Sequence, residues 1–180
     1  MKLTYQIPGK LYYIQQFLDH PTYKKIHYDV FRSKLINLDS TEKNWDKNLK
    51  YGYKNFVKKT GLDINYKPLQ KIKILLENNL FHRLKIKKYE PMLHSMHDGT
   101  GINWHDDHGH TYGITYYINK RWDLKFGGEF LFTDKNSNGF IPVVGNSIVI
   151  VKAPFTHKVA PVMKPIVPRK TIQIFVGKDV

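Results

Sequence analysis

Residues 169–176 read Arg-Lys-Thr-Ile-Gln-Ile-Phe-Val, in which apolar positions largely alternate with polar or basic ones, as is typical of a β-strand. This stretch is the last of a series of short β-prone runs that follow Arg83 and are separated by glycine, proline and asparagine. The runs cover residues 84–97, 102–107, 111–119, 128–133, 147–153, 157–162 and 169–176. Many short strands punctuated in this way predict an antiparallel sandwich or barrel.

The first half of the chain has a different pattern. A strand is expected over residues 11–18, one helix is expected from Pro21 onward and another over residues 68–81, while residues 39–66 form a polar excursion with poor periodicity. The two helices carry apolar side chains at helical spacing, namely Tyr23, Ile26 and Val30 in the first and Leu69, Ile72, Leu76 and Leu80 in the second. Helices followed by strands predict an α+β protein in which the helices support one sheet.

Length and composition limit the class of protein. With 180 residues, 41% of them hydrophobic and 24% charged, the chain is expected to form one domain over residues 1–180, with helical support over 1–82 and the strands over 83–180. The lack of cysteine excludes disulfide scaffolds, thiolate zinc sites, iron–sulfur clusters and a cysteine nucleophile. No membrane span is expected, and Pro8, Gly9 and Lys10 interrupt any signal peptide, which favours a cytoplasmic location.

The formal net charge of +14 raises the question of a polyanionic partner. The basic residues are mostly lysine, since the arginines are only Arg32, Arg83, Arg121 and Arg169. Arginine is the residue that sequence-specific nucleic-acid readers prefer for its bidentate geometry. A solvated basic face is therefore favoured, with contact to nucleic acid kept as an alternative.

One constellation of residues could carry chemistry. In a strand-like stretch, His105 and Asp107 project from the same face while Asp106 points away. His157, which opens a later strand, could supply a third ligand. Two histidines and one carboxylate form the facial triad of non-haem Fe(II) oxygenases, and zinc accepts the same ligands. By themselves, the same residues could also be ordinary polar side chains at a strand edge and a half-buried histidine.

Residues 94–177 resemble the double-stranded β-helix (jelly-roll) core of the Fe(II)/2-oxoglutarate dioxygenases, particularly the prolyl 4-hydroxylase-like branch. The residues that carry this resemblance are Asp98-Gly99-Thr100-Gly101, His105-Asp106-Asp107, Tyr116-Tyr117-Ile118-Asn119-Lys120-Arg121-Trp122, Gly127-Gly128-Glu129-Phe130, His157 and Arg169-Lys170-Thr171-Ile172-Gln173.

The resemblance implies a role for each matching residue. His105, Asp107 and His157 would bind Fe(II) as the catalytic centre, and Arg169 would pair with the distal carboxylate of 2-oxoglutarate, assisted by the Tyr117 hydroxyl. Thr171 would share the inward face with Arg169, whereas Ile172, Ile174 and Val176 would face the helices. Implied co-reactants are Fe(II), 2-oxoglutarate and O2, with ascorbate as an auxiliary reductant.

The sequence departs from the family pattern at two places. The segment from His157 to Arg169 is longer than is usual in the family, so Lys164 and Lys170 are alternative partners for the carboxylate. Where many relatives carry a tyrosine that contacts 2-oxoglutarate, this chain has Ser95 and Met96. The remaining nearby histidines, His94, His97, His108 and His110, are interpreted as neighbours of the site rather than as metal ligands.

The resemblance predicts a dioxygenase that hydroxylates a C–H bond, with a prolyl residue of a peptide or protein as the first substrate expected. Asp107 favours hydroxylation over halogenation, because halogenating relatives lack this carboxylate. A nucleic-acid demethylase of the same cofactor class is an alternative, but that branch carries a second arginine where this chain has Phe175. A basic jelly-roll binding module without enzymatic activity is the third interpretation.

Overall fold

The computed structural model describes residues 1–32, 49, 53, 57–79 and 89–177. The elements, in chain order, are β1 (Lys2–Ile7), β2 (Leu11–Gln15), α1 (His20–Arg32), β3 (Lys58–Gly61), α3 (Lys67–Asn79), β4 (Tyr89–Met96), β5 (Ile102–His105), β6 (Tyr112–Tyr117), the 3-10 helix η2 (Leu124–Phe126), β7 (Phe130–Asp134), β8 (Ser137–Ile141), β9 (Ser147–Lys152), β10 (His157–Val159) and β11 (Arg169–Val176).

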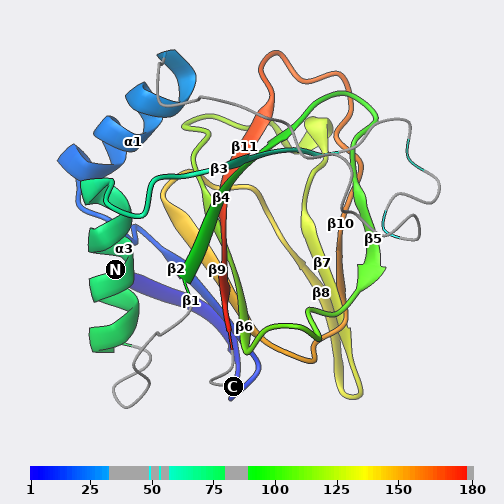
Figure 1. Ribbon diagram of the computed structural model, residues 1–180. Coiled ribbons are helices and arrows are strands. Elements are labelled where there is room, and N and C mark those ends of the chain that lie inside the picture. Colours follow the sequence, from blue (N-terminus) through cyan, green and yellow to red (C-terminus); the bar gives the residue numbers. More distant parts are fainter. Residues whose placement is uncertain (33–48, 50–52, 54–56, 80–88, 178–180) are drawn as a thin grey trace.

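The strands form two sheets. A seven-stranded sheet has the order β1-β2-β9-β6-β11-β4-β3, and a four-stranded sheet has the order β5-β10-β7-β8. Neighbouring strands run antiparallel, and successive strands from β4 onward alternate between the sheets, except for the β7–β8 hairpin. This is a jelly roll, and with its helices it confirms the α+β prediction (Figure 1).

Helices α1 and α3 cover the outer face of the seven-stranded sheet (Figure 1). Both apolar stripes expected from the sequence are buried there, as far as Leu76 in α3; Leu80 lies outside the described residues. The backbone N–H and hydroxyl of Thr22 donate to the carboxylate of Asp19, which caps the start of α1. Neither helix is long and apolar enough to cross a bilayer.

A second core fills the space between the two sheets. Strand β9 shows how both cores are built, because its residues Ser147–Val151 are all buried. Ile148 and Ile150 pack toward the helices, whereas Val149 and Val151 pack toward the four-stranded sheet. A strand that is covered on both faces needs a continuous apolar run, which explains the sequence Ser-Ile-Val-Ile-Val.

Three observed strands were not predicted from the sequence. β1 and β8 are edge strands whose side chains are mostly exposed, so neither shows a strong apolar signal. β3 lies inside the segment expected to be a polar excursion and is recruited by pairing with β4. The N-terminal part of the chain therefore contributes three strands as well as helices. Pairing with a neighbour, rather than apolar periodicity, defines these strands.

Candidate active site

The predicted metal ligands meet at one end of the four-stranded sheet. His105 ends β5, Asp107 follows two residues later, and His157 begins β10, where it is the direct register partner of His105. Each of the three residues offers a ligand atom, and these atoms all lie within 4.8 Å of one another. In the described part of the chain, this is the one group of three or more such residues close enough to hold a metal ion.

Both imidazole rings are held by the backbone carbonyl two residues before them in the chain. His105 Nδ1 donates to the carbonyl of Asn103 at 2.7 Å, and His157 Nδ1 donates to the carbonyl of Phe155 at 2.7 Å. A carbonyl only accepts hydrogen bonds, so Nδ1 carries the proton and Nε2 is left with its lone pair. Both Nε2 atoms lie 3.8 Å from the Asp107 carboxylate, one on each oxygen. The three donors therefore converge, as a metal ion requires.

The surroundings of His157 keep its imidazole in the protonation state that binds a metal. Burial, together with the neighbouring His105 ring, lowers the pKa of His157 to about 4, so its imidazole is neutral near pH 7. The Phe130 ring stacks on His157 with 4.9 Å between centroids. Asp107 Oδ2 is buried and has no hydrogen-bond partner among the described residues. A buried carboxylate oxygen without a donor is costly, and a cation would satisfy it.

Strand β6 leaves room for this carboxylate. A Cβ atom on Gly113 would lie 2.0 Å from Asp107 Oδ2, a distance at which one of the two groups must move. Glycine at this position therefore lets the Asp107 carboxylate lie directly against the backbone of β6. The residues fit an Fe(II) ion held by two imidazoles and one carboxylate.

A second part of the candidate site is built around Arg169, the first residue of β11. Its side chain is 2% exposed, and its guanidinium lies 5.1 Å from the centre of the Tyr117 ring. Nη1 donates to the sulfur of Met96 at 3.0 Å, but Nε and Nη2 are buried without a hydrogen-bond partner in the described structure, as is the Tyr117 hydroxyl. Buried donors of this kind fit a carboxylate such as that of 2-oxoglutarate.

The neighbours of Arg169 fix its position. A Cβ atom on Gly128 would lie 2.7 Å from Arg169 Cδ, so glycine permits the close approach. Asn119 donates to the carbonyl of Pro168 at 2.9 Å and accepts from the backbone N–H of Lys170 at 2.7 Å, which holds the backbone on both sides of the arginine. Burial lowers the pKa of Arg169, an effect that Tyr117 and Glu129 oppose, and the guanidinium stays charged near neutral pH.

The two parts share the interior between the sheets. Phe130, which stacks on His157, belongs to the same buried cluster as Tyr117, whose ring lies under Arg169. Thr171 is 1% exposed and pairs in register with Tyr117, on the same face of β11 as Arg169. The predicted metal-binding and co-substrate-binding residues are thus brought into one compartment.

The alternative partners for the carboxylate lie elsewhere. Lys170 donates to the carbonyl of Val30 at 2.8 Å and lies over the Phe31 ring, so it points to α1. Lys164 is exposed in the long loop before β11. Arg169 is therefore the basic side chain that reaches the interior, as the alternating strand after it predicted.

The neighbouring histidines have other surroundings. His94 is buried on β4, and burial, with Lys59 and Arg169 nearby, lowers its pKa to about 3. His108 lies 2.8 Å from the Asp106 carboxylate. His110 stacks on Phe175 with 4.3 Å between ring centroids.

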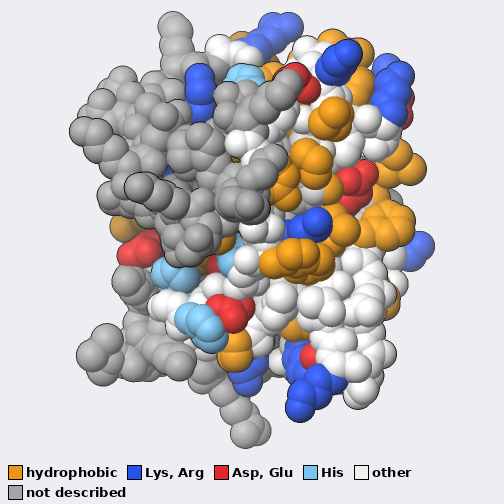
Figure 2. All heavy atoms as spheres, turned by 90° about the vertical axis from the view of Figure 1, so that its right-hand side faces the viewer, with side chains coloured by type: hydrophobic (Ala, Val, Ile, Leu, Met, Phe, Trp, Pro, Cys, Tyr) orange, Lys and Arg blue, Asp and Glu red, His pale blue; other side chains and the backbone are white. Residues whose placement is uncertain are grey.

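A surface pocket of about 480 Å³ adjoins the triad. Its lining includes Asp106, His108, His110 and Phe175 beside the ligands His105 and Asp107. Figure 2 shows histidine and acidic side chains gathered on this side of the molecule, next to an apolar area. The pocket offers a route by which a substrate could reach the triad from outside.

Sequence reasoning missed several residues that shape the site. Met96 was noted only as a departure, yet its sulfur is the acceptor for Arg169. Gly113 carries a signal that could have been used, because a glycine inside an apolar strand often marks a close approach. The carbonyls of Asn103 and Phe155 carry no sequence signal, since every residue offers a carbonyl.

Comparison with known proteins finds a family match for the jelly-roll core. Residues 91–177 match the family model described as the 2OG-Fe(II) oxygenase superfamily. No curated protein matches the sequence of the chain.

Solved structures with a similar fold include three prolyl hydroxylases. A prolyl-4-hydroxylase from Pseudomonas putida has a TM-score of 0.71 at 13% identity, over 96% of this chain and 95% of that one. A prolyl hydroxylase from Trichoplax adhaerens, in complex with a hypoxia-inducible-factor peptide, has a TM-score of 0.70 at 17% identity, over 94% and 84%. A viral collagen prolyl hydroxylase from Paramecium Bursaria Chlorella virus-1, in a 2-oxoglutarate complex, has a TM-score of 0.64 at 13% identity, over 93% and 96%.

At these identities the structural likeness concerns the fold, whereas the match over residues 91–177 concerns the sequence of the jelly-roll core itself. Taken together, they show that residues 91–177 are similar to the 2OG-Fe(II) oxygenase superfamily and that the chain has the fold of the prolyl hydroxylases named above.

Proposed function

We propose that this protein is an Fe(II)- and 2-oxoglutarate-dependent hydroxylase whose substrate is a prolyl residue of a peptide or protein. The observation that carries the proposal is the buried Arg169 guanidinium, with two nitrogens that lack partners in the described structure, in the same interior as the His105–Asp107–His157 triad. Buried donors of a guanidinium without hydrogen-bond partners are costly, and a dicarboxylic co-substrate would satisfy them.

Each residue of the site would have its own role in binding the iron or the co-substrate. The triad would hold the iron through two Nε2 atoms and one carboxylate, leaving the remaining coordination positions to co-substrate and O2. Arg169 would bind the distal carboxylate of 2-oxoglutarate and thereby fix its orientation, and Tyr117 would donate its hydroxyl there. When bound, the iron supplies the chemistry that converts 2-oxoglutarate and O2 to succinate and CO2 while one oxygen atom enters a substrate C–H bond.

The pocket of about 480 Å³ beside His105 and Asp107 supports a substrate that approaches from the surface. A peptide substrate is supported by analogy with the Trichoplax adhaerens hydroxylase, which was solved with a peptide. The analogy rests on the fold, so the substrate class needs its own test.

The cofactor class is tested by succinate formation from 2-oxoglutarate with Fe(II), ascorbate and O2. We expect slow turnover by the wild type, even without the prime substrate, and turnover at background level in His105→Ala and Arg169→Ala. His108→Ala is the matched control, since this histidine lies in the same loop but pairs with Asp106. Failure of 2-oxoglutarate to bind the iron-loaded wild type would contradict the proposal.

The substrate class is tested by mass spectrometry of proline-containing peptides after incubation with the enzyme. We expect a gain of about one oxygen atom on proline, as this chemistry requires. A methylated single-stranded oligonucleotide serves as the rival substrate. Demethylation of the oligonucleotide, with the peptides unmodified, would move the protein to the nucleic-acid branch of the family.

A further inference from the structure

A second pocket lies at the end of the jelly roll opposite the triad. Its walls come from the loops that follow β6, β8 and β10, whereas His105 ends β5 and His157 begins β10. The volume is about 720 Å³. Sites for small molecules in proteins usually measure about 300–1,000 Å³, so this pocket is large enough for one.

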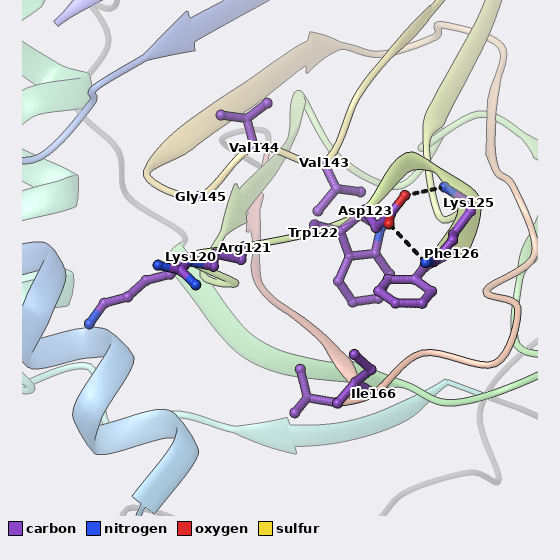
Figure 3. A pocket seen from close by; sticks show the side chains of 11 residues that line it. Lys120, Arg121, Trp122, Asp123, Lys125, Phe126, Val143, Val144, Gly145 and Ile166 are labelled. Carbon is purple, nitrogen blue, oxygen red and sulfur yellow. Dashed lines mark hydrogen bonds and ion pairs between the residues drawn. The ribbon is translucent and has the colours of Figure 1, made fainter.

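The walls of this pocket are mainly apolar. The Trp122 and Phe126 rings meet edge to face, with 5.5 Å between centroids and 71° between planes. Val143 and Ile166 lie on either side of these rings (Figure 3). Ile166 is 87% exposed, so a large apolar side chain is left in water at the mouth. Exposed apolar surface at a concave site is typical of a place where a ligand binds.

Trp122 separates this pocket from the Arg169 compartment. Its side chain packs against both interior clusters, one of which contains Tyr117 and the other Met96, the two neighbours of Arg169. Its indole N–H donates to the carbonyl of Gly127 at 2.8 Å, which fixes the ring and satisfies its polar atom. A ligand in this pocket would therefore meet the apolar surface of the indole without entering the co-substrate compartment.

Two cations that border the pocket, Lys120 and Arg121, have no carboxylate partner in the described part of the chain. Arg121 lines the pocket, is exposed, and has the planar head group of the two. Lys125, in contrast, pairs with Asp123 at 3.1 Å. The planar guanidinium of an arginine matches a carboxylate with two parallel hydrogen bonds.

We infer that the pocket between Arg121, Trp122, Phe126 and Ile166 binds a small apolar carboxylate. The apolar part lies against the two aromatic rings and Ile166, and the carboxylate pairs with Arg121. This site is distinct from the proposed 2-oxoglutarate site, because the triad and Arg169 contribute nothing to it.

The test is isothermal titration of the full chain with decanoate, and with decylammonium as a probe of equal length and opposite charge. Decanoate binds and decylammonium does not. Arg121→Glu weakens decanoate binding at least about tenfold, the effect of losing one charge-assisted pair. Ile166→Asp weakens it as well, and the exposure of Ile166 leaves folding unaffected.

The matched controls lie on the outer face of the four-stranded sheet. Lys158→Glu removes a cation that lies over Trp104, and Phe140→Asp removes an apolar side chain that is 64% exposed. Neither changes decanoate binding. A second titration in the presence of saturating 2-oxoglutarate gives the same decanoate affinity.

Three results would overturn the inference: equal binding of both probes, unchanged affinity in Arg121→Glu, or displacement of decanoate by 2-oxoglutarate. Vesicles with anionic lipid serve as a separate arm, and binding to vesicles without binding of decanoate would assign these loops to a membrane surface instead. All readouts are binding constants, so they are independent of whether the enzyme turns over.

Discussion

The two faces of strand β11 contrast sharply although they alternate along the same eight residues. Ile172, Ile174 and Val176 face the helices and belong to a closely packed apolar cluster. Arg169 and Thr171 face the interior between the sheets, where donors of Arg169 have no partner in the described structure. One face of the strand packs the core of the fold, whereas the other carries buried donors that are costly unless a ligand satisfies them.

The largest expected effect on stability lies on the helix face. Ile174→Ala should lower the free energy of unfolding by about 2–5 kcal/mol, because a fully buried side chain leaves a cavity. Chemical denaturation measures the loss. The affinity for 2-oxoglutarate should stay within about twofold, since Ile174 does not face the interior. A large drop in that affinity would mean that the two faces are coupled.

On the interior face, Arg169→Met should have the opposite effect: the affinity for 2-oxoglutarate falls, whereas the stability of the ligand-free protein does not. It removes the charged donors but keeps much of the apolar volume, so 2-oxoglutarate affinity should fall about 100-fold or more. The ligand-free protein should gain about 1 kcal/mol or more, because a buried guanidinium with two unsatisfied donor nitrogens is lost. Calorimetry and thermal denaturation measure the two quantities. A less stable ligand-free variant would show that Arg169 has a structural role that these contacts do not reveal.

A smaller change on the interior face of the same sheet, in strand β6, tests how the Asp107 carboxylate is positioned for metal binding. Gly113→Ala places a methyl group against the Asp107 carboxylate and should weaken Fe(II) binding about 10–100-fold, as displacement of a ligand's support does. Gly61→Ala is the control, since a Cβ atom there meets nothing within 4 Å. Equal metal affinity in the two variants would show that Asp107 can move without loss.

The smallest expected effect concerns pH. His94 is buried on the interior face, and burial lowers its pKa to about 3, whereas in the unfolded chain the pKa is near the ordinary histidine value of 6.5. The unfolded chain binds more protons between these values, so the contribution of His94 is complete above pH 6.5 and is lost as the pH falls. From pH 6.5 to 5 this amounts to at most about 2 kcal/mol.

Denaturation at several pH values checks this expectation. His94→Gln should lose less stability than the wild type over that interval. The control His108→Gln replaces an exposed histidine and should follow the wild-type slope. If the wild type and His94→Gln lose the same stability, His94 does not titrate as its burial implies.

Sequence reasoning worked best where local pattern and tertiary structure agree. The alternation in β11 predicted which residues face the helices, and the apolar stripes of α1 and α3 predicted their buried faces. It failed for β1 and β8, since edge strands need no apolar alternation. Residues 84–88, the first part of the strand expected over 84–97, lie outside the described residues, so that part stays a prediction.

By itself, the sequence determined the elements of the site. The run after Arg169 turns its side chain inward, because side chains alternate along a strand with a period of two. The sequence also predicts His105 and Asp107 on one face of a strand, but β5 ends at His105 and Asp107 lies in the loop that follows.

Only the tertiary structure decided how these elements meet. The pairing of β5 with β10 places His157 opposite His105, and the pairing of β11 with β4 places the Met96 sulfur against Arg169. Register between distant strands depends on the packing of the whole jelly roll, which no local pattern encodes. The same holds for the pocket at the opposite end, whose walls come from three loops that are far apart in the chain.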